Sequence, residues 1–387
     1  MIMAFGLYVH WPYCESKCPY CDFNSHVANA IDSERWVKAY QNEIERVARS
    51  CPDEILSTIF IGGGTPSLMK PEIVEAVLGA ATSAWRTTND LEITMEANPG
   101  SVDAARFRSY ASAGVNRVSL GIQSLDDTHL RLLGRKHGRD EALAAIEIAQ
   151  NTFSRVNIDL IYARQNQTID AWYAELSEAI SLGTGHMSLY QLTIEDGTVF
   201  AQRHKAGHLR GLPGDDSAAD MFELTQSLCA AAGLPAYEVS NHARPGEECR
   251  HNMIYWQAGR YAGVGPGAHG RIQLDKRRIA TEAIRDPGQW LRAVEEVGNG
   301  EHPETSLTSE DQITETLLMG LRINEGLPLA QLEKAGLALN DWQSRLDLIA
   351  EGYLEADDDR LKTTASGRLL LNSVIGCLLQ DLKTTQS

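Results

Sequence analysis

Residues 8–23 read YVHWPYCESKCPYCDF, and this stretch holds three of the seven cysteines of the chain, Cys14, Cys18 and Cys21. Their spacing, with three residues and then two between them, lets thiolates from one loop surround a corner of a compact iron–sulfur cube. No fourth cysteine lies nearby. A structural zinc site is usually closed by four protein ligands, whereas a catalytic centre keeps one position open for an exogenous group. The stretch therefore predicts a cluster with one open iron.

Two other interpretations of these cysteines remain open. A zinc ion with His10 or His26 as its fourth ligand would use the same three thiolates. Alternatively, the three cysteines are unrelated and pack as small apolar side chains. The close spacing favours the open cluster over both alternatives.

At these residues the sequence resembles the radical S-adenosylmethionine (SAM) superfamily, whose members place an aromatic residue, here Tyr20, just before the last cysteine. The resemblance implies a [4Fe-4S] cluster on Cys14, Cys18 and Cys21, with SAM bound to the open iron. In that superfamily one electron from the cluster cleaves SAM to a 5′-deoxyadenosyl radical, so the cofactors carry the chemistry and the protein binds and orients them. The resemblance also implies an electron donor such as a flavodoxin or ferredoxin.

Composition limits the classes of partner. The chain has 387 residues, 43% of them hydrophobic, and its 35 basic against 52 acidic residues give a net charge of −17. Such a balance repels phosphate backbones and anionic lipids, so we expect no nucleic-acid partner. The odd, scattered cysteines do not fit a secreted disulfide framework, and no signal peptide or membrane-length apolar run is present. These features indicate a soluble cytoplasmic protein.

Apolar runs of strand length alternate with segments of helical periodicity along the first half of the chain. The expected strands are residues 5–10, 58–61, 91–96, 117–122, 155–162 and 186–192. This alternation predicts βα units, which give either an open barrel or a doubly wound sheet. The resemblance selects the first, a partial (β/α)6 TIM-like barrel of radical SAM type in an α/β fold.

The ends of the expected strands carry the candidate cofactor residues, because loops converge at the carboxyl edge of such sheets. The second strand is followed by Gly63, Gly64 and Thr65 in a GGGTP turn, whose backbone can approach a ligand closely with its N–H groups exposed. The third strand ends at Glu96, a candidate acceptor of hydrogen bonds from a ribose, although an isolated Glu there is more often simply solvated.

Further motifs narrow the resemblance. YxHxPxC, GGGTP, EANP, GIQS, GR and NIDLIY occur in this order at residues 8–14, 62–66, 96–99, 121–124, 134–135 and 157–162. This order is similar to the oxygen-independent coproporphyrinogen oxidase group and, within it, to the HemW-type heme chaperones. The resemblance implies a SAM site lined by Tyr8, Gly63, Gly64, Thr65, Glu96, Gln123, Arg135 and Asp159. Structural roles as backbone caps are the alternative for Gln123 and Arg135.

One departure concerns the loop after the fifth strand. The family commonly continues with Gly-Leu-Pro, whereas this chain has Ala163, Arg164 and Gln165. We therefore expect a differently shaped loop, with consequences for the contacts of Asp159.

The second informative stretch is residues 249–256, CRHNMIYW. An exposed His251 is a candidate axial ligand of heme iron, with Tyr255 and Trp256 packed on the macrocycle, although a His near Trp is more often structural. The HNxxYW pattern resembles a sequence motif that is typical of the HemW-type chaperones. This resemblance implies heme and a heme-acceptor protein as partners. Cys249 is the competing thiolate ligand, and His269 is expected to be structural.

Residues 317–321, 329–335 and 342–351 are expected as helices, followed by a hairpin of residues 353–355 and 361–364. This pattern predicts a small winged-helix-like unit. Its many acids argue against a DNA-reading helix, so a lid or docking role is expected. We divide the chain into a barrel at 1–232, a heme-binding or connecting region at 233–305 and the winged-helix-like unit at 306–387.

Two functions compete on this resemblance: a heme chaperone, and an oxygen-independent coproporphyrinogen III oxidase. The oxidases carry a further Cys two residues beyond the cluster motif, where this chain has Phe23, and a long segment before the cluster, where this chain has thirteen residues. Both features, with the HNxxYW stretch, favour the chaperone. Whether SAM is cleaved, and hence whether the protein is an enzyme, stays open.

Overall fold

The computed structural model describes residues 4–28, 30–357 and 359–384. Its main sheet is built around six parallel strands that follow the order of the chain. These strands are β1 (Phe5–Trp11), β4 (Ile55–Gly63), β5 (Arg86–Ala97), β6 (Arg117–Gln123), β7 (Arg155–Tyr162) and β8 (His186–Gln191). The predicted α/β architecture of six parallel strands is confirmed.

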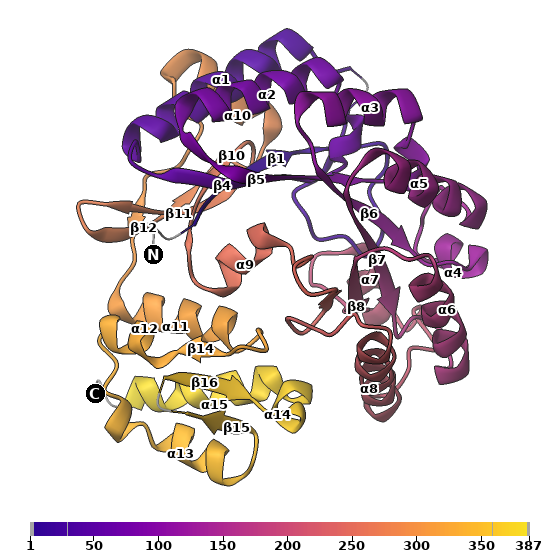
Figure 1. Ribbon diagram of the computed structural model, residues 1–387, viewed down its shortest axis with the longest axis vertical. Helices are drawn as coiled ribbons and strands as arrows, with labels where there is room; N and C mark the ends of the chain where they lie inside the picture. The colour runs from indigo at the N-terminus through magenta and orange to yellow at the C-terminus, as the bar shows by residue number, and fades with distance from the viewer. Residues whose placement is uncertain (1–3, 29, 358, 385–387) are drawn as a thin grey trace.

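Helices cover the outer face of this curved sheet (Figure 1). They are α1 (Ser33–Ser50), α2 (Pro71–Ala84), α3 (Ala104–Ala113), α4 (Asp127–Leu132), α5 (Arg139–Thr152), α6 (Ile169–Ser181) and α8 (Asp215–Ala231). Helix α1 shows why these segments form helices and pack on the sheet. Asp32 caps α1 by accepting the N–H of Arg35, and one face of the helix buries Trp36 and Tyr40. None of the helices in the described ranges is long and apolar enough to cross a membrane.

The sheet continues beyond the six strands at both edges. β9 (Asn241–Ala243) pairs antiparallel with β8, and β10 (Arg260–Val264) pairs parallel with β1 on the other side. β11 (His269–Leu274), β12 (Arg277–Glu282) and β13 (Thr305–Ser306) then extend the β10 edge, and α10 (Pro287–Val297) packs near α1. The sequence patterns had indicated none of these strands. The region at 233–305 therefore contributes strands to both edges of the main sheet, while the division of the chain into domains stays a prediction.

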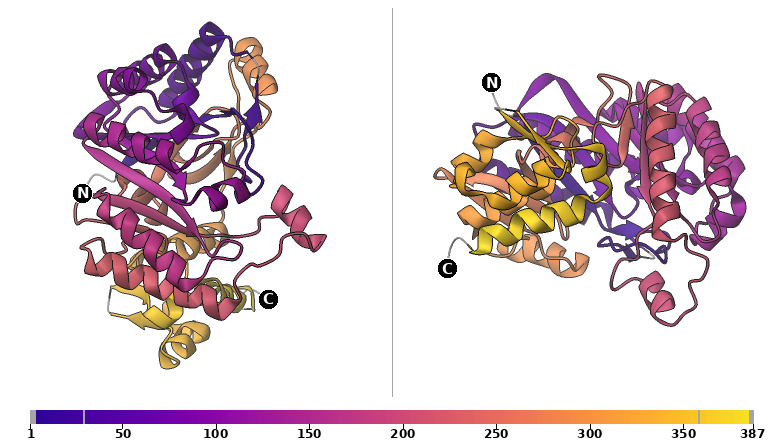
Figure 2. Two further views of the ribbon diagram at one scale, coloured as in Figure 1. Left: turned by 90° about the vertical axis from the view of Figure 1, so that its right-hand side faces the viewer. Right: turned by 90° about the horizontal axis from the view of Figure 1, so that it is seen from below.

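The cluster motif lies in a loop at the carboxyl edge of β1, between β2 (Tyr13–Cys14) and β3 (His26–Val27). Two 3-10 turns, η1 (Pro66–Leu68) and η2 (Pro99–Ser101), follow β4 and β5 at the same edge. The short helix α7 (Val199–Lys205) stands out from the body of the molecule (Figure 2) and contacts this loop, since the N–H of Phe200 donates to the carbonyl of Pro19 at 2.9 Å.

The C-terminal residues form a small unit with its own apolar core, centred on Leu317, Leu332, Trp342, Leu361 and Leu378. Its helices and strands are α11 (Ser309–Gly320), β14 (Leu327–Pro328), α12 (Leu329–Lys334), η3 (Leu339–Asp341), α13 (Gln343–Ala350), β15 (Leu354–Ala356), β16 (Arg360–Thr363), α14 (Ala365–Leu369) and α15 (Leu371–Thr384). The predicted three helices and hairpin are present. β14, which pairs with β16, and the two last helices were not predicted.

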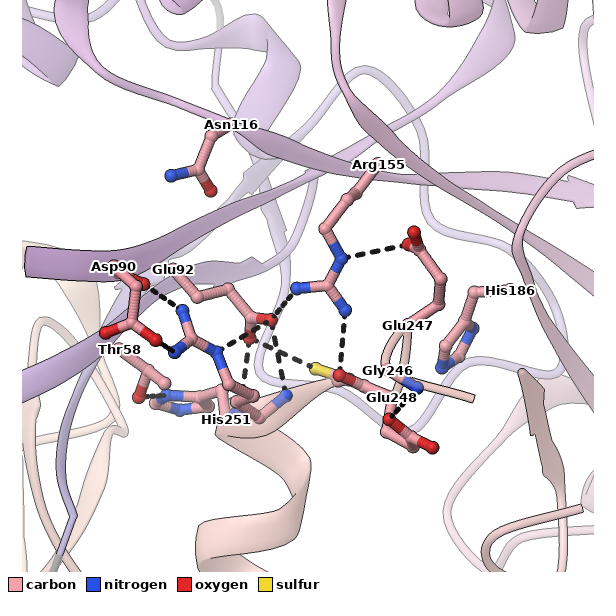
Figure 3. Close-up of polar contacts among 12 residues, drawn as sticks. Thr58, Asp90, Glu92, Asn116, Arg155, His186, Gly246, Glu247, Glu248 and His251 are labelled. Atoms are coloured by element: carbon pink, nitrogen blue, oxygen red, sulfur yellow. Dashed lines mark hydrogen bonds and ion pairs between the residues drawn. The ribbon is translucent and has the colours of Figure 1, made fainter. Parts of the chain in front are cut away.

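Helix α9 (Arg250–Trp256) lies on the inner side of the sheet, between the sheet and the C-terminal unit (Figure 1). Glu92 of β5, whose side chain is 1% exposed, accepts the N–H groups of Arg250 at 3.3 Å and His251 at 3.1 Å. Arg155 of β7 forms an ion pair with the same carboxylate (Figure 3). A carboxylate at a helix N-terminus satisfies N–H groups that have no partner within the helix, so Glu92 fixes where α9 begins.

Replacing Glu92 by Gln is expected to lower the free energy of unfolding by about 3–5 kcal/mol, because the buried Arg117 loses the charge of Glu92 and Arg155 keeps only its ion pair with the more exposed Glu247. Burial opposes the charge of Glu92, yet Arg117 and Arg155 hold its pKa below the usual range, so the folded protein contains the ionised form. Urea denaturation measures the change.

The matched control is Asp90→Asn, which breaks the ion pair between Arg250 and the 75% exposed Asp90. An exposed pair contributes at most about 1 kcal/mol, so the control should unfold nearly as the wild type does. Equal losses in the two variants would contradict the role of Glu92.

Candidate cluster and cofactor site

The three cysteines of the motif are free and half-buried, with Cys14 at the end of β2 and Cys18 and Cys21 on the loop that leads to β3. Two polar donors point at their sulfurs: the hydroxyl of Thr65 lies 3.4 Å from Cys14 Sγ, and a guanidinium nitrogen of Arg135 lies 3.4 Å from Cys18 Sγ. Donors and a positive charge beside sulfur stabilise thiolates and an anionic cluster. The donor set therefore fits an iron–sulfur cluster.

The histidines of the zinc alternative are already engaged. His10 uses both ring nitrogens, one with the hydroxyl of Tyr8 at 2.9 Å and the other with the carbonyl of Asn24 at 2.9 Å. His26 bonds the Asn24 side chain at 3.1 Å. In the described part of the chain no three Cys, His, Asp or Glu side chains are arranged around a single ion. His10 would have to give up a hydrogen bond to complete a zinc site, whereas a cluster with one open iron needs only the three thiolates.

The glycine turn after β4 is pressed against the cluster loop. Gly63 has φ +115°, and a Cβ on it would lie 2.7 Å from the carbonyl oxygen of Trp11. A Cβ on Gly64 would lie 2.7 Å from the carbonyl oxygen of Tyr13 and 3.1 Å from Cys14 Sγ. Any side chain at these positions must therefore displace the cluster loop.

The N–H groups of this turn are not exposed, contrary to the expectation from sequence. Gly63 donates to Glu96 at 3.1 Å, Gly64 to Trp11 at 2.7 Å and Thr65 to Tyr13 at 2.9 Å. The turn uses its donors to fix the cluster loop and Glu96. A ligand amine at this turn has to be met by acceptors, namely carbonyl oxygens and the carboxylate of Glu96.

Two carboxyl groups face a cavity of about 230 Å³ on the inner side of the sheet, together with Tyr8, Arg117 and Tyr255. Burial and the nearby charge of Asp159 raise the pKa of Glu96 to about 8. Burial also raises the pKa of Asp159, which accepts hydrogen bonds from Ser119 at 3.2 Å and Asn157 at 2.7 Å. At neutral pH Glu96 therefore carries a proton in the ligand-free protein.

The remaining predicted cofactor residues lie around this carboxyl edge. Gln123 ends β6 in a left-handed conformation, with φ 69°. Arg135 also donates to the carbonyl of Gly121 at 2.9 Å, which is the capping role considered as an alternative. Tyr20 packs against Phe200 of α7, with ring centroids 6.2 Å apart. Of the predicted cofactor residues, Tyr8, Gly63 and Glu96 also line a second cavity, which is larger than the first.

A second cavity of about 480 Å³ runs from the glycine turn to the C-terminal unit. It meets the first cavity at Tyr8, Glu96 and Tyr255. Its far wall consists of aromatic residues of α9 and β10, arginines of β11 and β12, and Glu315 and Met319 of α11. Sequence reasoning found Trp256 and Tyr255 but missed the arginines, since their strands had not been predicted.

His251 is fully buried, so the expectation of an exposed side chain is wrong. Its Nδ1 pairs with the hydroxyl of Thr58 at 2.8 Å, and its Nε2 with the hydroxyl of Tyr255 at 2.7 Å. Burial lowers the pKa of His251 to about 3, which keeps the ring neutral. The axial role of His251 stays a prediction, and it requires one of these two hydrogen bonds to break.

Cys249, the competing ligand, is also fully buried. Its sulfur lies 3.8 Å from a carboxylate oxygen of Glu92, and burial raises the pKa of the thiol to about 11. A protonated, enclosed thiol is a poor metal ligand.

The loop after β7, whose sequence differs from the family's usual Gly-Leu-Pro, is held by a left-handed residue and a buried ion pair. Ala163 has φ 55°, the left-handed region that glycine favours and that the family's usual Gly satisfies. Arg164, which is 2% exposed, forms an ion pair with Glu175. Asp159 accepts hydrogen bonds from Ser119 and Asn157, neither of which lies in this loop.

Comparison with known proteins identifies the family of the chain. Residues 8–176 match the radical SAM superfamily, and residues 307–370 match the HemN C-terminal domain. The heme chaperone HemW of Escherichia coli (strain K12) is 37% identical over 381 residues, covering 97% of this chain and 98% of that protein. The mitochondrial radical S-adenosyl methionine domain-containing protein 1 of Bos taurus is 36% identical over 389 residues, covering 98% of this chain and 88% of that protein.

Among solved structures, coproporphyrinogen III oxidase (HemN) from Escherichia coli has a TM-score of 0.80 at 22% identity, covering 97% of this chain and 90% of that chain. That likeness concerns the fold alone, and it confirms the radical SAM type of the barrel with its C-terminal unit. The superfamily implies a [4Fe-4S] cluster and SAM as cofactors. With relatives of this similarity along nearly its whole length, the chain belongs to the radical SAM superfamily and, within it, to the family of the HemW heme chaperones.

Proposed function

We propose that this protein is a heme chaperone that binds heme on a radical SAM scaffold and passes it to an acceptor protein. The observation that carries the proposal is the 37% identity to the heme chaperone HemW over 97% of the chain. The HNxxYW stretch supports it, because α9 brings Tyr255 and Trp256 to the wall of the larger cavity. The acceptor protein, an electron donor of the flavodoxin or ferredoxin kind and a cytoplasmic location belong to the same proposal.

We assign the cluster to Cys14, Cys18 and Cys21. Arg135 would offset its negative charge, and Thr65 would donate to its sulfur ligand. When bound, the cluster supplies the electron for reductive cleavage of SAM.

SAM is assigned to the adjoining end of the larger cavity. The protein's part is to orient it: Glu96 and the carbonyl oxygens of the glycine turn accept its donors, while Tyr8 closes the inner side through its bond to His10. Gln123, Arg135 and Asp159 complete the proposed surroundings, with Tyr20 behind the cluster loop.

The oxidase alternative gains no specific support. Phe23, which stands where the oxidases have a further Cys, lies on the cluster loop and is 58% exposed. The structural likeness to the oxidase comes at 22% identity and concerns the fold.

Hemin titration of the anaerobic, cluster-reconstituted protein tests the function, with transfer to an apo-hemoprotein as the second readout. Saturable uptake with a Soret band, followed by transfer, is expected. An anaerobic coproporphyrinogen assay on the same preparation is expected to give no product. Absent hemin uptake together with decarboxylation would replace the chaperone proposal by the oxidase.

Replacing Cys14, Cys18 and Cys21 by Ala is expected to abolish bound iron and sulfide after reconstitution, because these thiols are the cluster's protein ligands in our assignment. Iron and sulfide analysis with the visible spectrum provides the measurement. Cys377→Ser is the matched control, since Cys377 is exposed and far along the chain. Unchanged cluster content in the triple variant would end the assignment.

Replacing Glu96 by Gln is expected to weaken SAM binding about ten- to a hundredfold near pH 8, the loss of one charge-assisted hydrogen bond of about 1.5–3 kcal/mol. Below its pKa of about 8 the carboxyl is protonated, so wild-type affinity should fall as pH decreases, by up to about tenfold per pH unit. The Gln variant should show no such slope.

Calorimetry on the reconstituted protein at about pH 6 and about pH 8 measures both affinities. Glu75→Gln on the exposed face of α2 serves as the control. An identical affinity and pH slope for wild type and Glu96→Gln would remove Glu96 from the SAM site.

A further inference from the structure

The far wall of the larger cavity is positively charged, although the protein as a whole carries a net charge of −17. Arg271, Arg278 and Arg285 line it, and the carboxyl groups among its lining residues are those of Glu96 and Glu315. Glu96 lies at the opposite end, beside the glycine turn. Three guanidinium groups therefore face one carboxylate, which makes this end of the cavity suited to an anion.

The same wall is aromatic. Tyr255, Trp256 and Tyr261 line the cavity, with the rings of Tyr255 and Tyr261 in edge-to-face contact at 4.5 Å. Arg322, which is not part of the lining, lies over Trp256 at 4.7 Å and fixes the indole. Fixed aromatic rings give an apolar wall against which a planar ligand can pack.

The guanidinium groups of Arg271 and Arg278 are paired with the carboxylate of Glu315 in the ligand-free protein. Arg271 donates to it at 2.7 Å through Nε and lies 2.6 Å away through a terminal nitrogen, while Arg278 Nε lies 3.8 Å away. Arg278 also donates to the carbonyls of Ala258 and Gly259, at 2.6 and 3.2 Å, which fixes its position. Glu315 lies on α11, and Figure 1 shows α11 facing β11 and β12 from the C-terminal unit. This ion pair therefore ties the C-terminal unit to the edge of the sheet.

The cavity also contains the imidazole of His269, which would bind a metal without breaking a hydrogen bond to another described residue. His269 at the start of β11 is exposed and lines the cavity, and among the described residues its ring has no hydrogen-bond partner. Burial of part of the ring lowers the pKa of His269, so it is neutral at pH 7 and able to ligate a metal. His10 and His251 differ, because both of their ring nitrogens are hydrogen-bonded.

We propose that this cavity is the binding site for a planar iron macrocycle with peripheral carboxylates. The carboxylates of the ligand pair with Arg271 and Arg278 in exchange for Glu315, its ring packs against Tyr255 and Trp256, and His269 faces the iron. The whole cavity, including the end assigned to SAM, measures about 480 Å³, which lies within the range of roughly 300–1,000 Å³ that small-molecule sites occupy. The proposal rests on the proposed function in naming heme as the ligand.

Hemin and hemin dimethyl ester are the probes, because the ester keeps the ring and the iron but lacks the carboxylates. In the variant carrying both Arg271→Gln and Arg278→Gln, hemin affinity is expected to fall about ten- to a hundredfold, the loss of one charge-assisted contact or more. Affinity for the ester should change little. Arg277→Gln, next to Arg278 on β12 but absent from the cavity lining, is the matched control and should bind both probes as the wild type does.

Glu315→Gln gives a result of opposite sign. Removing the competing carboxylate is expected to strengthen hemin binding severalfold and to leave the ester unchanged. A damaged fold does not produce tighter and selective binding, so this variant keeps the test decisive even where the arginine variant folds poorly. Equal affinities of wild type, the arginine variant and Glu315→Gln for hemin would overturn the proposal while leaving the chaperone function standing. No uptake of hemin by the wild type would instead contradict the proposed function.

The iron ligand is tested by the spectrum of the hemin complex. His269→Ala is expected to shift the Soret band because the axial nitrogen is removed, and added imidazole should restore it. His251→Ala is the comparison, since it also removes an imidazole. A Soret shift in His251→Ala without one in His269→Ala would assign the iron to His251 and overturn the placement of the ligand at His269.

Discussion

One buried carboxylate determines where the inner helix lies. Glu92 of β5 accepts two N–H groups at the start of α9 and pairs with Arg155 of β7. An isolated charge inside a protein is strongly unfavourable, so the carboxylate, its arginine and the helix start are stable only as a unit. α9 then carries Tyr255 and Trp256 to the wall of the larger cavity. An ion pair at the inner side of the sheet thus shapes a binding wall several residues away along the helix.

At the carboxyl edge the corresponding constraint is steric. Gly63 and Gly64 let β4 continue directly beneath the cluster loop, where a Cβ would meet a backbone oxygen at 2.7 Å. Their N–H groups are used to hold the loop and Glu96, rather than left for a ligand. The turn therefore fixes the positions of Cys14 and Glu96, both of which it contacts.

The features that could be predicted from sequence are local ones. Each of the six parallel strands is a short apolar run between helical segments, and the cysteines and the glycine turn are contiguous motifs. β10 was missed because its neighbour in the sheet is β1, which lies at the other end of this part of the chain. The burial of His251 was missed for the same physical reason: its partners Thr58 and Glu92 come from strands far earlier in the sequence. Pairing between distant segments leaves no local pattern.

The two cavities join at Tyr8, Glu96 and Tyr255, so two bound ligands would share one continuous space. SAM carries a sulfonium and an ammonium group, and the end it is assigned to offers the carboxyl of Glu96. The arginine end offers guanidinium groups to carboxylates. Each end attracts the charge that the other repels, so under our assignment electrostatics would sort the two ligands even though the space is continuous. The positive charge of bound SAM would in turn favour ionised Glu96, and bound carboxylates would release Glu315 from Arg271. Under our assignment, occupation of one end would thus change the charge in the shared cavity, and release of Glu315 would loosen the contact that holds α11 to the sheet.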